Sequence, residues 1–173
     1  MPRSWVSCGG NCSTRRITHD HSTRSFHRLL HLWRSARKAI YISVLPERKS
    51  NAELGRVRNV AFANILAESE SGAVIWAQEP GRIEDVTLDR VRLRLRKGPL
   101  SESYGGNIDL RPAFDPQWAI FRHDLAGIFC HGASGLTLNQ VEVRWDADAP
   151  DYHTHAVRCE ETSRLVIDGF RGR

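Results

Sequence analysis

The sequence predicts an all-β protein whose strands form a right-handed, single-stranded parallel β-helix. Two observations favour this fold class. A nine-residue apolar frame recurs along the chain, and short alternating strands follow one another with turn residues but no helices between them. A repeat with a period of about 25 residues is typical of solenoids, in which each unit buries its apolar side chains against the next.

The frame has four apolar positions separated by steps of three, two and three residues. It begins at Val57, Ile83 and Ala133, and in a weaker form at Thr162, so that successive copies start 26, 50 and 29 residues apart. The central pair of each copy alternates with polar or small residues, which is the pattern of a strand with one buried face. The 50-residue interval indicates that one copy is skipped or degenerate.

A second short strand precedes three of the copies, and it is expected at 73–76, 127–130 and 156–159. A β-sandwich is the alternative architecture. Its strands would be joined by hairpins, but no Asn-Gly or Asp-Gly pair lies between the frames. Cys130 and Cys159 end two of these short strands, one period apart, so we expect their thiols to lie near each other in adjacent coils.

Charge divides the chain into two parts. Residues 1–50 carry a formal charge of +8, whereas residues 51–173 carry −3. We interpret residues 1–50 as a basic lead-in without the repeat, and residues 51–173 as the coils. Apolar residues at helical spacing predict an amphipathic helix over about 25–41, with the rest of the lead-in disordered. Two alternatives stay open: an organelle transit peptide, or residues that are not native to the domain behind them.

Cys8, Cys12, His27 and His31 have a spacing that would suit a tetrahedral zinc site. The linker lacks the aromatic and leucine positions of a zinc finger, so zinc is the weaker interpretation and we expect no cofactor. No apolar run reaches the roughly 18–20 residues of a membrane span, and no secretory signal is visible. The sequence therefore predicts no membrane association and leaves the cellular location open.

Residues 97–122 are rich in Gly, Pro and Ser and interrupt the repeat, so we expect a long excursion from the coils. Long loops on solenoids usually form the binding surface. The candidate substrate-binding residues are Asp109, Arg111, Trp118 and His123. For Asp109 and Arg111 the alternative is an ion pair that fixes the loop, and for His123 it is a solvated position beside Asp124.

Two further groups of residues have both a functional and a structural interpretation. The acidic and histidine residues of 146–155 could hold a cation, although a polar exposed turn is the simpler interpretation. Trp76 and Trp145 could stack on sugar rings, although a place in the core or along the flank of a coil is commoner.

Residues 56–173 resemble the C-terminal coils of glycoside hydrolase family 28, the polygalacturonase-like enzymes, in their rhamnogalacturonidase-type branch. The resemblance is carried by Val57–Val91 with its Glu68-Ser-Glu-Ser-Gly72 run, by Asp109-Leu-Arg-Pro112, and by Val143-Arg-Trp145 followed by Tyr152. It implies a pectin-lyase-like β-helix, a pectin-like polysaccharide as partner, and inverting hydrolysis by clustered aspartates. Members of this family are typically secreted or periplasmic.

The family's four catalytic signatures, Asn-Thr-Asp, Asp-Asp, Gly-His-Gly and Arg-Ile-Lys, are missing from this sequence. Val74-Ile-Trp76 stands where the resemblance would place Arg-Ile-Lys. We therefore assign no catalytic residue and expect the chain to be inactive alone, as the C-terminal portion of such a hydrolase. The alternatives are a non-catalytic carbohydrate-binding β-solenoid and, less favoured, zinc or nucleic-acid binding through residues 1–50.

Overall fold

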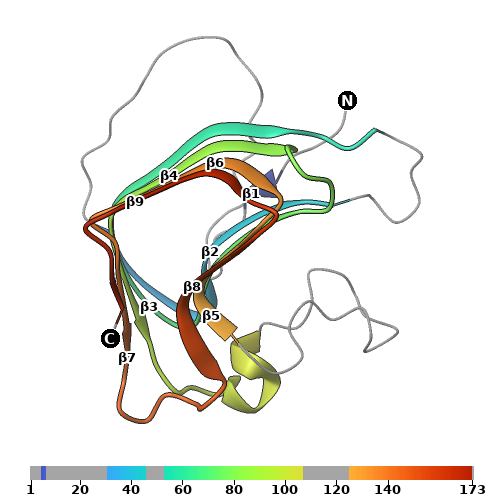
Figure 1. The fold of residues 1–173 in the computed structure, drawn as a ribbon. Coiled ribbons are helices and arrows are strands. Elements are labelled where there is room, and N and C mark those ends of the chain that lie inside the picture. The colour runs from blue at the N-terminus through green and yellow to red at the C-terminus, as the bar shows by residue number, and fades with distance from the viewer. Residues whose placement is uncertain (1–4, 7–30, 46–52, 107–124, 173) are drawn as a thin grey trace.

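A parallel β-sheet that curls around a buried apolar core makes up most of the structure (Figure 1). The computed structural model describes residues 5–6, 31–45, 53–106 and 125–172. The strands and the one 3-10 helix, η1, are, in chain order, β1 (Trp5–Val6), β2 (His31–Val44), β3 (Val57–Ala77), β4 (Ile83–Leu95), η1 (Ser101–Gly106), β5 (Leu125–His131), β6 (Ala133–Asn139), β7 (Glu142–Trp145), β8 (His153–Glu160), β9 (Ser163–Asp168) and β10 (Arg171–Gly172).

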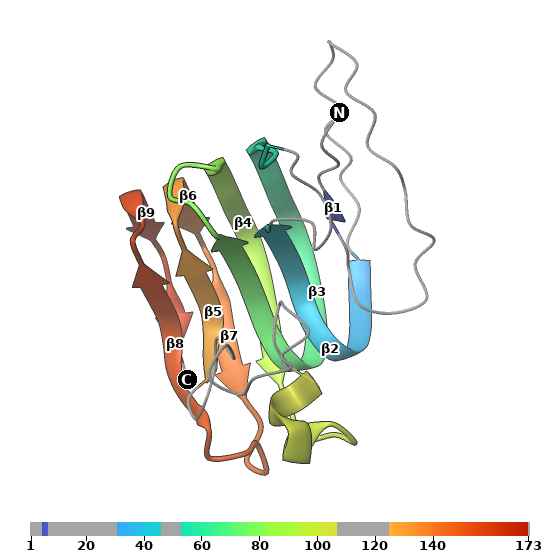
Figure 2. The same ribbon diagram turned by 90° about the vertical axis from the view of Figure 1, so that its right-hand side faces the viewer.

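The sheet has three segments joined by corners. The motif segment contains the first part of β3, the first part of β4, β6 and β9. The second segment contains the start of β2, the middle of β3, the end of β4, β7 and β10. The third segment contains the end of β2, the end of β3, β5 and β8. Figure 2 shows the strands side by side along the stack.

All described strand pairs are parallel except β1 with β2, which are antiparallel. This confirms the predicted all-β, parallel character of residues 57–172 and excludes the sandwich, whose hairpins would give antiparallel neighbours. β4 pairs directly with β6, with Ile83 beside Ala133. No strand of a further copy therefore lies between these two, so the 50-residue interval corresponds to a skipped copy of the frame.

The nine-residue frame forms the core. In the second copy Ile83, Val86, Leu88 and Val91 are fully buried. In the third copy Ala133, Leu136, Leu138 and Val141 are equally buried. The first three of these lie in register with Ile83, Val86 and Leu88. Each inward position thus repeats from strand to strand as a continuous apolar row.

The steps of three in the frame have a backbone cause. A residue with a left-handed conformation lies within each of these steps: Asn59, Asp85, Gly135 and Arg164 in the first, and Asn64, Arg90, Gln140 and Gly169 in the second. Such a residue turns the chain and breaks the two-residue alternation, so the next inward side chain comes three positions later instead of two. The frame therefore marks the corners of the sheet as well as its core.

The amphipathic helix predicted over 25–41 is wrong where the structure describes it, because His31–Val44 is strand β2. β2 pairs with β3, including Ile40 beside Ala73 and Ile42 beside Ile75. Ile40, Ile42 and Val44 are buried at alternate positions, and the β-branched residues suit a pleated surface. Pairing with β3 overrides the helical spacing, and β2 joins the sheet although it precedes the boundary placed at residue 50.

Candidate functional site

The predicted substrate-binding residues Asp109, Arg111, Trp118 and His123 lie outside the described part of the chain. Their assignment stays a prediction. The same holds for Cys8, Cys12 and His27 of the alternative zinc site. His31 is the first residue of β2, with its backbone beside that of Ile65.

The base of the predicted excursion is described, and it is built around the side chain of Glu70. Glu70 is only 2% exposed, and its Oε2 accepts a hydrogen bond of 2.7 Å from the backbone N–H of Leu100. A Cβ added to Gly98 would collide with this carboxylate, and one added to Gly105 would collide with the Glu70 carbonyl. The segment after β4 can therefore fold over Glu70 because glycine occupies both positions of close approach.

Ser69, Ser71 and Ser101, which are neighbours of Glu70 or Leu100 along the chain, are buried as well. The Ser69 hydroxyl donates to the carbonyl of Ser71 at 2.6 Å, and the Ser101 hydroxyl accepts the N–H of Gly98 at 2.8 Å. Among the described residues, Oε1 of Glu70 has no hydrogen-bond partner. A buried carboxylate oxygen is costly to leave unpaired, so Oε1 is an acceptor that a further polar group could satisfy.

His153, at the start of β8, approaches the same corner. Burial lowers the pKa of His153, and the backbone of Glu70 opposes this shift only in part. Its ring lies 4.8 Å from that of Tyr152, whose carbonyl accepts the N–H of Leu125 at 2.7 Å. The first residues of β5 and β8 are thus held beside the Glu70 corner. We call Ser69, Glu70, Ser71, Ser101 and His153 the corner cluster.

The corner cluster combines one carboxylate, one imidazole and three hydroxyl groups at the point where the chain leaves the sheet. Hydrogen bonding to a ligand rich in hydroxyl groups is the chemistry that these groups can support. Acid–base chemistry by a carboxylate pair needs two carboxyl groups about 6.5–9.5 Å apart for inverting glycoside hydrolysis, and Glu70 is the sole carboxylate of the cluster.

The side of the third segment that faces away from the main core carries a stack of aromatic rings, in which Phe129 is buried. Trp76 lies over His131 with ring centroids 4.1 Å apart and planes 16° apart, and its centroid is 5.9 Å from that of Phe129. Nδ1 of His131 contacts the carbonyl of Ala77 at 3.0 Å. His131 covers one face of Trp76, so this tryptophan serves the packing of adjacent strands. Trp145 packs against the core, which agrees with its structural interpretation.

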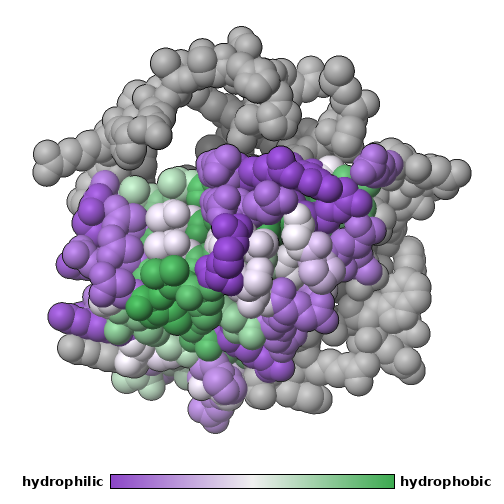
Figure 3. All heavy atoms as spheres, turned by 45° about the horizontal axis from the view of Figure 1, so that its top comes forward, coloured by the Kyte–Doolittle hydropathy of each residue, from purple (hydrophilic) through white to green (hydrophobic). Residues whose placement is uncertain are grey.

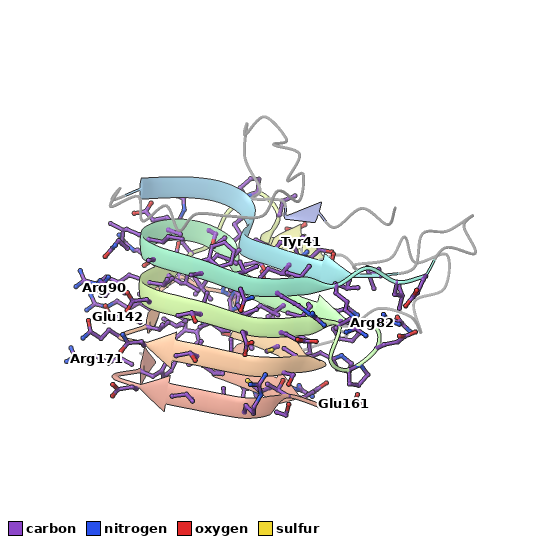
Figure 4. All side chains as sticks on the ribbon, turned by 90° about the horizontal axis from the view of Figure 1, so that it is seen from above. Tyr41, Arg82, Arg90, Glu142, Glu161 and Arg171 are labelled. Carbon is purple, nitrogen blue, oxygen red and sulfur yellow. The ribbon has the colours of Figure 1, made fainter. Side chains whose placement is uncertain are left out.

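Charged residues line the corners of the motif segment. Figure 4 shows Arg90, Glu142 and Arg171 along one edge and Arg82 and Glu161 at the other. Arg144 pairs with Glu142 at 2.6 Å, and Arg82 with Glu79 at 2.8 Å. On β8, Arg158 pairs with Glu160 at 2.7 Å. These surface ion pairs keep the outside of the sheet hydrophilic and contribute little to the stability of the fold.

The acidic and histidine residues of 146–155 do not gather into one site. Asp146 pairs with Arg94 at 2.6 Å, whereas the ring of His155 contacts the hydroxyl of Thr154 at 2.7 Å. Within the described ranges no group of three or more His, Cys, Asp and Glu side chains could hold a metal ion. The polar-turn interpretation of this segment fits its geometry.

Sequence reasoning missed Glu70 and His153 as partners in one corner. A signal for Glu70 exists, because the run Glu68-Ser-Glu-Ser-Gly72 places two glutamates and two serines between the apolar stretches Ile65–Ala67 and Ala73–Ala77 of one strand. His153 offered no such signal. It lies far along the chain from Glu70, and only the order of the strands brings the two together.

No helix of the described residues is long and apolar enough to cross a membrane. No protein-family model, curated protein or solved structure matches the chain.

Proposed function

We propose that the curled parallel sheet is a right-handed parallel β-helix of the pectin-lyase-like type. The in-register stacking of the nine-residue frame supports this fold, because the same corner residues and the same inward rows recur in successive copies. The order of the three segments supports it too, since the chain passes from the motif segment to the second and then to the third segment before it starts the next copy.

The function that we infer is polysaccharide binding by the C-terminal coils of a protein similar to glycoside hydrolase family 28. The bound polymer would be pectin-like, and the chain would not hydrolyse it alone. The sequence resemblance supports the class of polymer, and Val74-Ile-Trp76 in place of Arg-Ile-Lys supports the missing hydrolysis. A self-sufficient carbohydrate-binding β-solenoid would use the same surface, without catalytic coils elsewhere.

The observation that carries the proposal is the corner cluster at the base of the 97–122 excursion. Its buried hydroxyl, carboxylate and imidazole groups lie at the point where the excursion begins. A ligand bound to the excursion would therefore have these polar groups as neighbours. η1, which begins the excursion, contacts β3 and β2, and Figure 2 shows it at the lower end of these strands.

Affinity electrophoresis in gels that contain polygalacturonate or rhamnogalacturonan tests the binding. We expect both polymers to retard the chain and a neutral dextran gel not to. Trp118→Ala should weaken retardation at least about tenfold, which corresponds to roughly 1.4 kcal/mol. Arg90→Ala is the matched control, because Arg90 is an exposed residue at a different corner, and its binding should be unchanged.

Release of reducing ends from the same polymers tests the missing hydrolysis. We expect none above the level of a heat-denatured sample. Equal retardation by dextran, or none in the pectin-type gels, would refute polysaccharide recognition of this class. Polymer cleavage by the purified chain would refute only the inactive part of the proposal.

A further inference from the structure

Cys130 and Cys159 form a pair across two neighbouring strands. They are directly opposite each other in the parallel pairing of β5 with β8, and both belong to the inward rows of the third segment. This confirms the predicted proximity of the two thiols. Backbones of paired strands lie roughly 4.7–4.9 Å apart, which falls within the Cα separation of about 4.4–6.8 Å that a disulfide requires.

The sulfur of Cys130 is surrounded by hydrogen-bond donors. The thiol of Cys159 donates to it and lowers the pKa of Cys130, burial opposes this effect, and the hydroxyl of Thr162, 3.5 Å away, and the N–H of Ala133 lower the pKa further. The contact with Cys130 and burial raise the pKa of Cys159. Loss of the first proton from the pair therefore leaves a thiolate on Cys130 that the remaining thiol of Cys159 stabilises.

Access to the pair comes from one side. Cys130 is fully buried, whereas Cys159 is partly exposed. Cys159 lies on β8, and β5 is the sole described strand that pairs with β8. A small disulfide or peroxide can therefore reach Cys159 first, with Cys130 directly behind it.

We propose that Cys130 and Cys159 are a reversible dithiol–disulfide site that ties the last strand of the third segment to the strand before it. With a small-molecule disulfide as oxidant, the Cys159 thiol passes its proton to the Cys130 thiolate and attacks one sulfur of the reagent. The S–S bond of the reagent breaks, and the departing sulfur takes up the proton that had left the pair and leaves as one thiol. Cys130 then loses its proton and attacks the sulfur of Cys159, and the second thiol leaves. Two protein thiols are oxidised to one disulfide, and the reagent is reduced to two thiols.

Oxidation of a Cys8→Ser/Cys12→Ser variant by glutathione disulfide tests the site, because Cys130 and Cys159 are then the remaining thiols. Trypsin should yield residues 123–144 and 159–164 as separate peptides with one cysteine each. We expect mass spectrometry of the native, oxidised protein to show these two peptides linked, and reduction to separate them. A lasting glutathione adduct on Cys159, or no reaction, would overturn the proposal.

Single variants in the same background test the order of events. Cys130→Ser should accumulate the glutathione adduct on Cys159, because no second thiol can displace it. Cys159→Ser should react slowly, since the remaining Cys130 is buried. Rapid reaction of Cys130 in that variant would contradict the assigned order.

A thermal scan supplies a readout that does not depend on the serine variants. The disulfide closes residues 131–158 into a loop, and such a cross-link stabilises mainly by restricting the unfolded chain. We expect the oxidised protein to melt roughly 5–10 °C above the reduced protein. A linked protein with an unchanged or lower melting temperature would show that the native geometry does not accommodate the bond.

Discussion

At the scale of single residues, the corner cluster places polar groups where the surrounding sheet is apolar. Glu70 and Ser71 of β3 are almost fully buried although their side chains are polar. The N–H of Leu100 pairs with one carboxylate oxygen, and glycine at 98 and 105 permits the close approach. The cluster thus fixes the point at which the chain leaves the sheet, at the expense of a partly desolvated carboxylate and imidazole.

His153 gives this corner a pH dependence. Its pKa in the folded protein is lowered from 6.5, chiefly by burial. Above about pH 6.5 the imidazole is neutral in both states and contributes nothing to the pH dependence. As the pH falls through that value the unfolded chain binds the proton first, so stability decreases until the pH passes below the folded pKa.

We expect the free energy of unfolding, measured in urea, to be lower at pH 5.5 than at pH 7.5, and His153→Gln to reduce this difference. His155→Gln is the matched control, because His155 is an exposed residue on the same strand. It should keep the full difference. An unaltered pH profile in His153→Gln would show that other groups cause the effect.

At the scale of elements, the frame joins strand and corner in one sequence pattern. Its steps of three contain the residues with positive φ, and these are Asn, Asp, Gly, Arg and Gln instead of glycine alone. A left-handed conformation costs a residue with a Cβ roughly 1–2 kcal/mol, and β-branched residues suffer most. Every copy of the frame contains this strain, and the burial of the stacked apolar rows offsets its free-energy cost.

Gln140 is a suitable position for measuring that strain, because it is exposed with φ of 51° and Gly169 stands at the equivalent corner of the next copy. We expect Gln140→Gly to change stability by less than about 1 kcal/mol, in the stabilising direction, since relief of strain exceeds the greater freedom of the unfolded chain. Gln140→Val should destabilise by roughly 1–2 kcal/mol. Urea unfolding of the three proteins gives both differences, and equal stability would contradict a strained corner.

The frame could be predicted from sequence because its pattern depends only on residues close to one another along the chain. Val86 and Leu88 show their burial by alternation, and the positions three residues away show the corners. β2 could not be predicted in the same way. Its apolar residues fit a helical period as well as a strand, and pairing with β3 decides between them. The corner cluster depends on strand order, so the sequence marks its residues without showing that they meet.

At the scale of the whole molecule, the two ends of the stack of strands differ, because one end is covered by a further strand and the other exposes apolar side chains. β2 covers the second and third segments of β3, with Leu32 beside Leu66 and Ile42 beside Ile75. At the other end, β9 exposes Leu165 at 41% and Ile167 at 48%, although the equivalent residues of β6 are fully buried. Figure 3 shows hydrophobic surface at this end of the stack among hydrophilic residues.

Because β2 belongs to the sheet, deletion of residues 1–50 should expose the edge of β3 and lower both the melting temperature and the solubility. Deletion of residues 1–28 is the control, because it retains β2 and should have the smaller effect on both. Circular dichroism melts and sedimentation of the soluble fraction measure the two properties. A protein of residues 51–173 that melts as the full chain does would show that β2 is dispensable.

The direct pairing of β4 with β6 has an evolutionary consequence. Thirty-seven residues separate Leu95 from Ala133, yet Ile83 still stacks on Ala133 in register. Within the motif segment and its two corners, by contrast, the spacing in each copy is fixed by the frame. Insertions can therefore accumulate between the second and third segments without disturbing the rows, and a lineage can acquire a new recognition loop there while it inherits the same core.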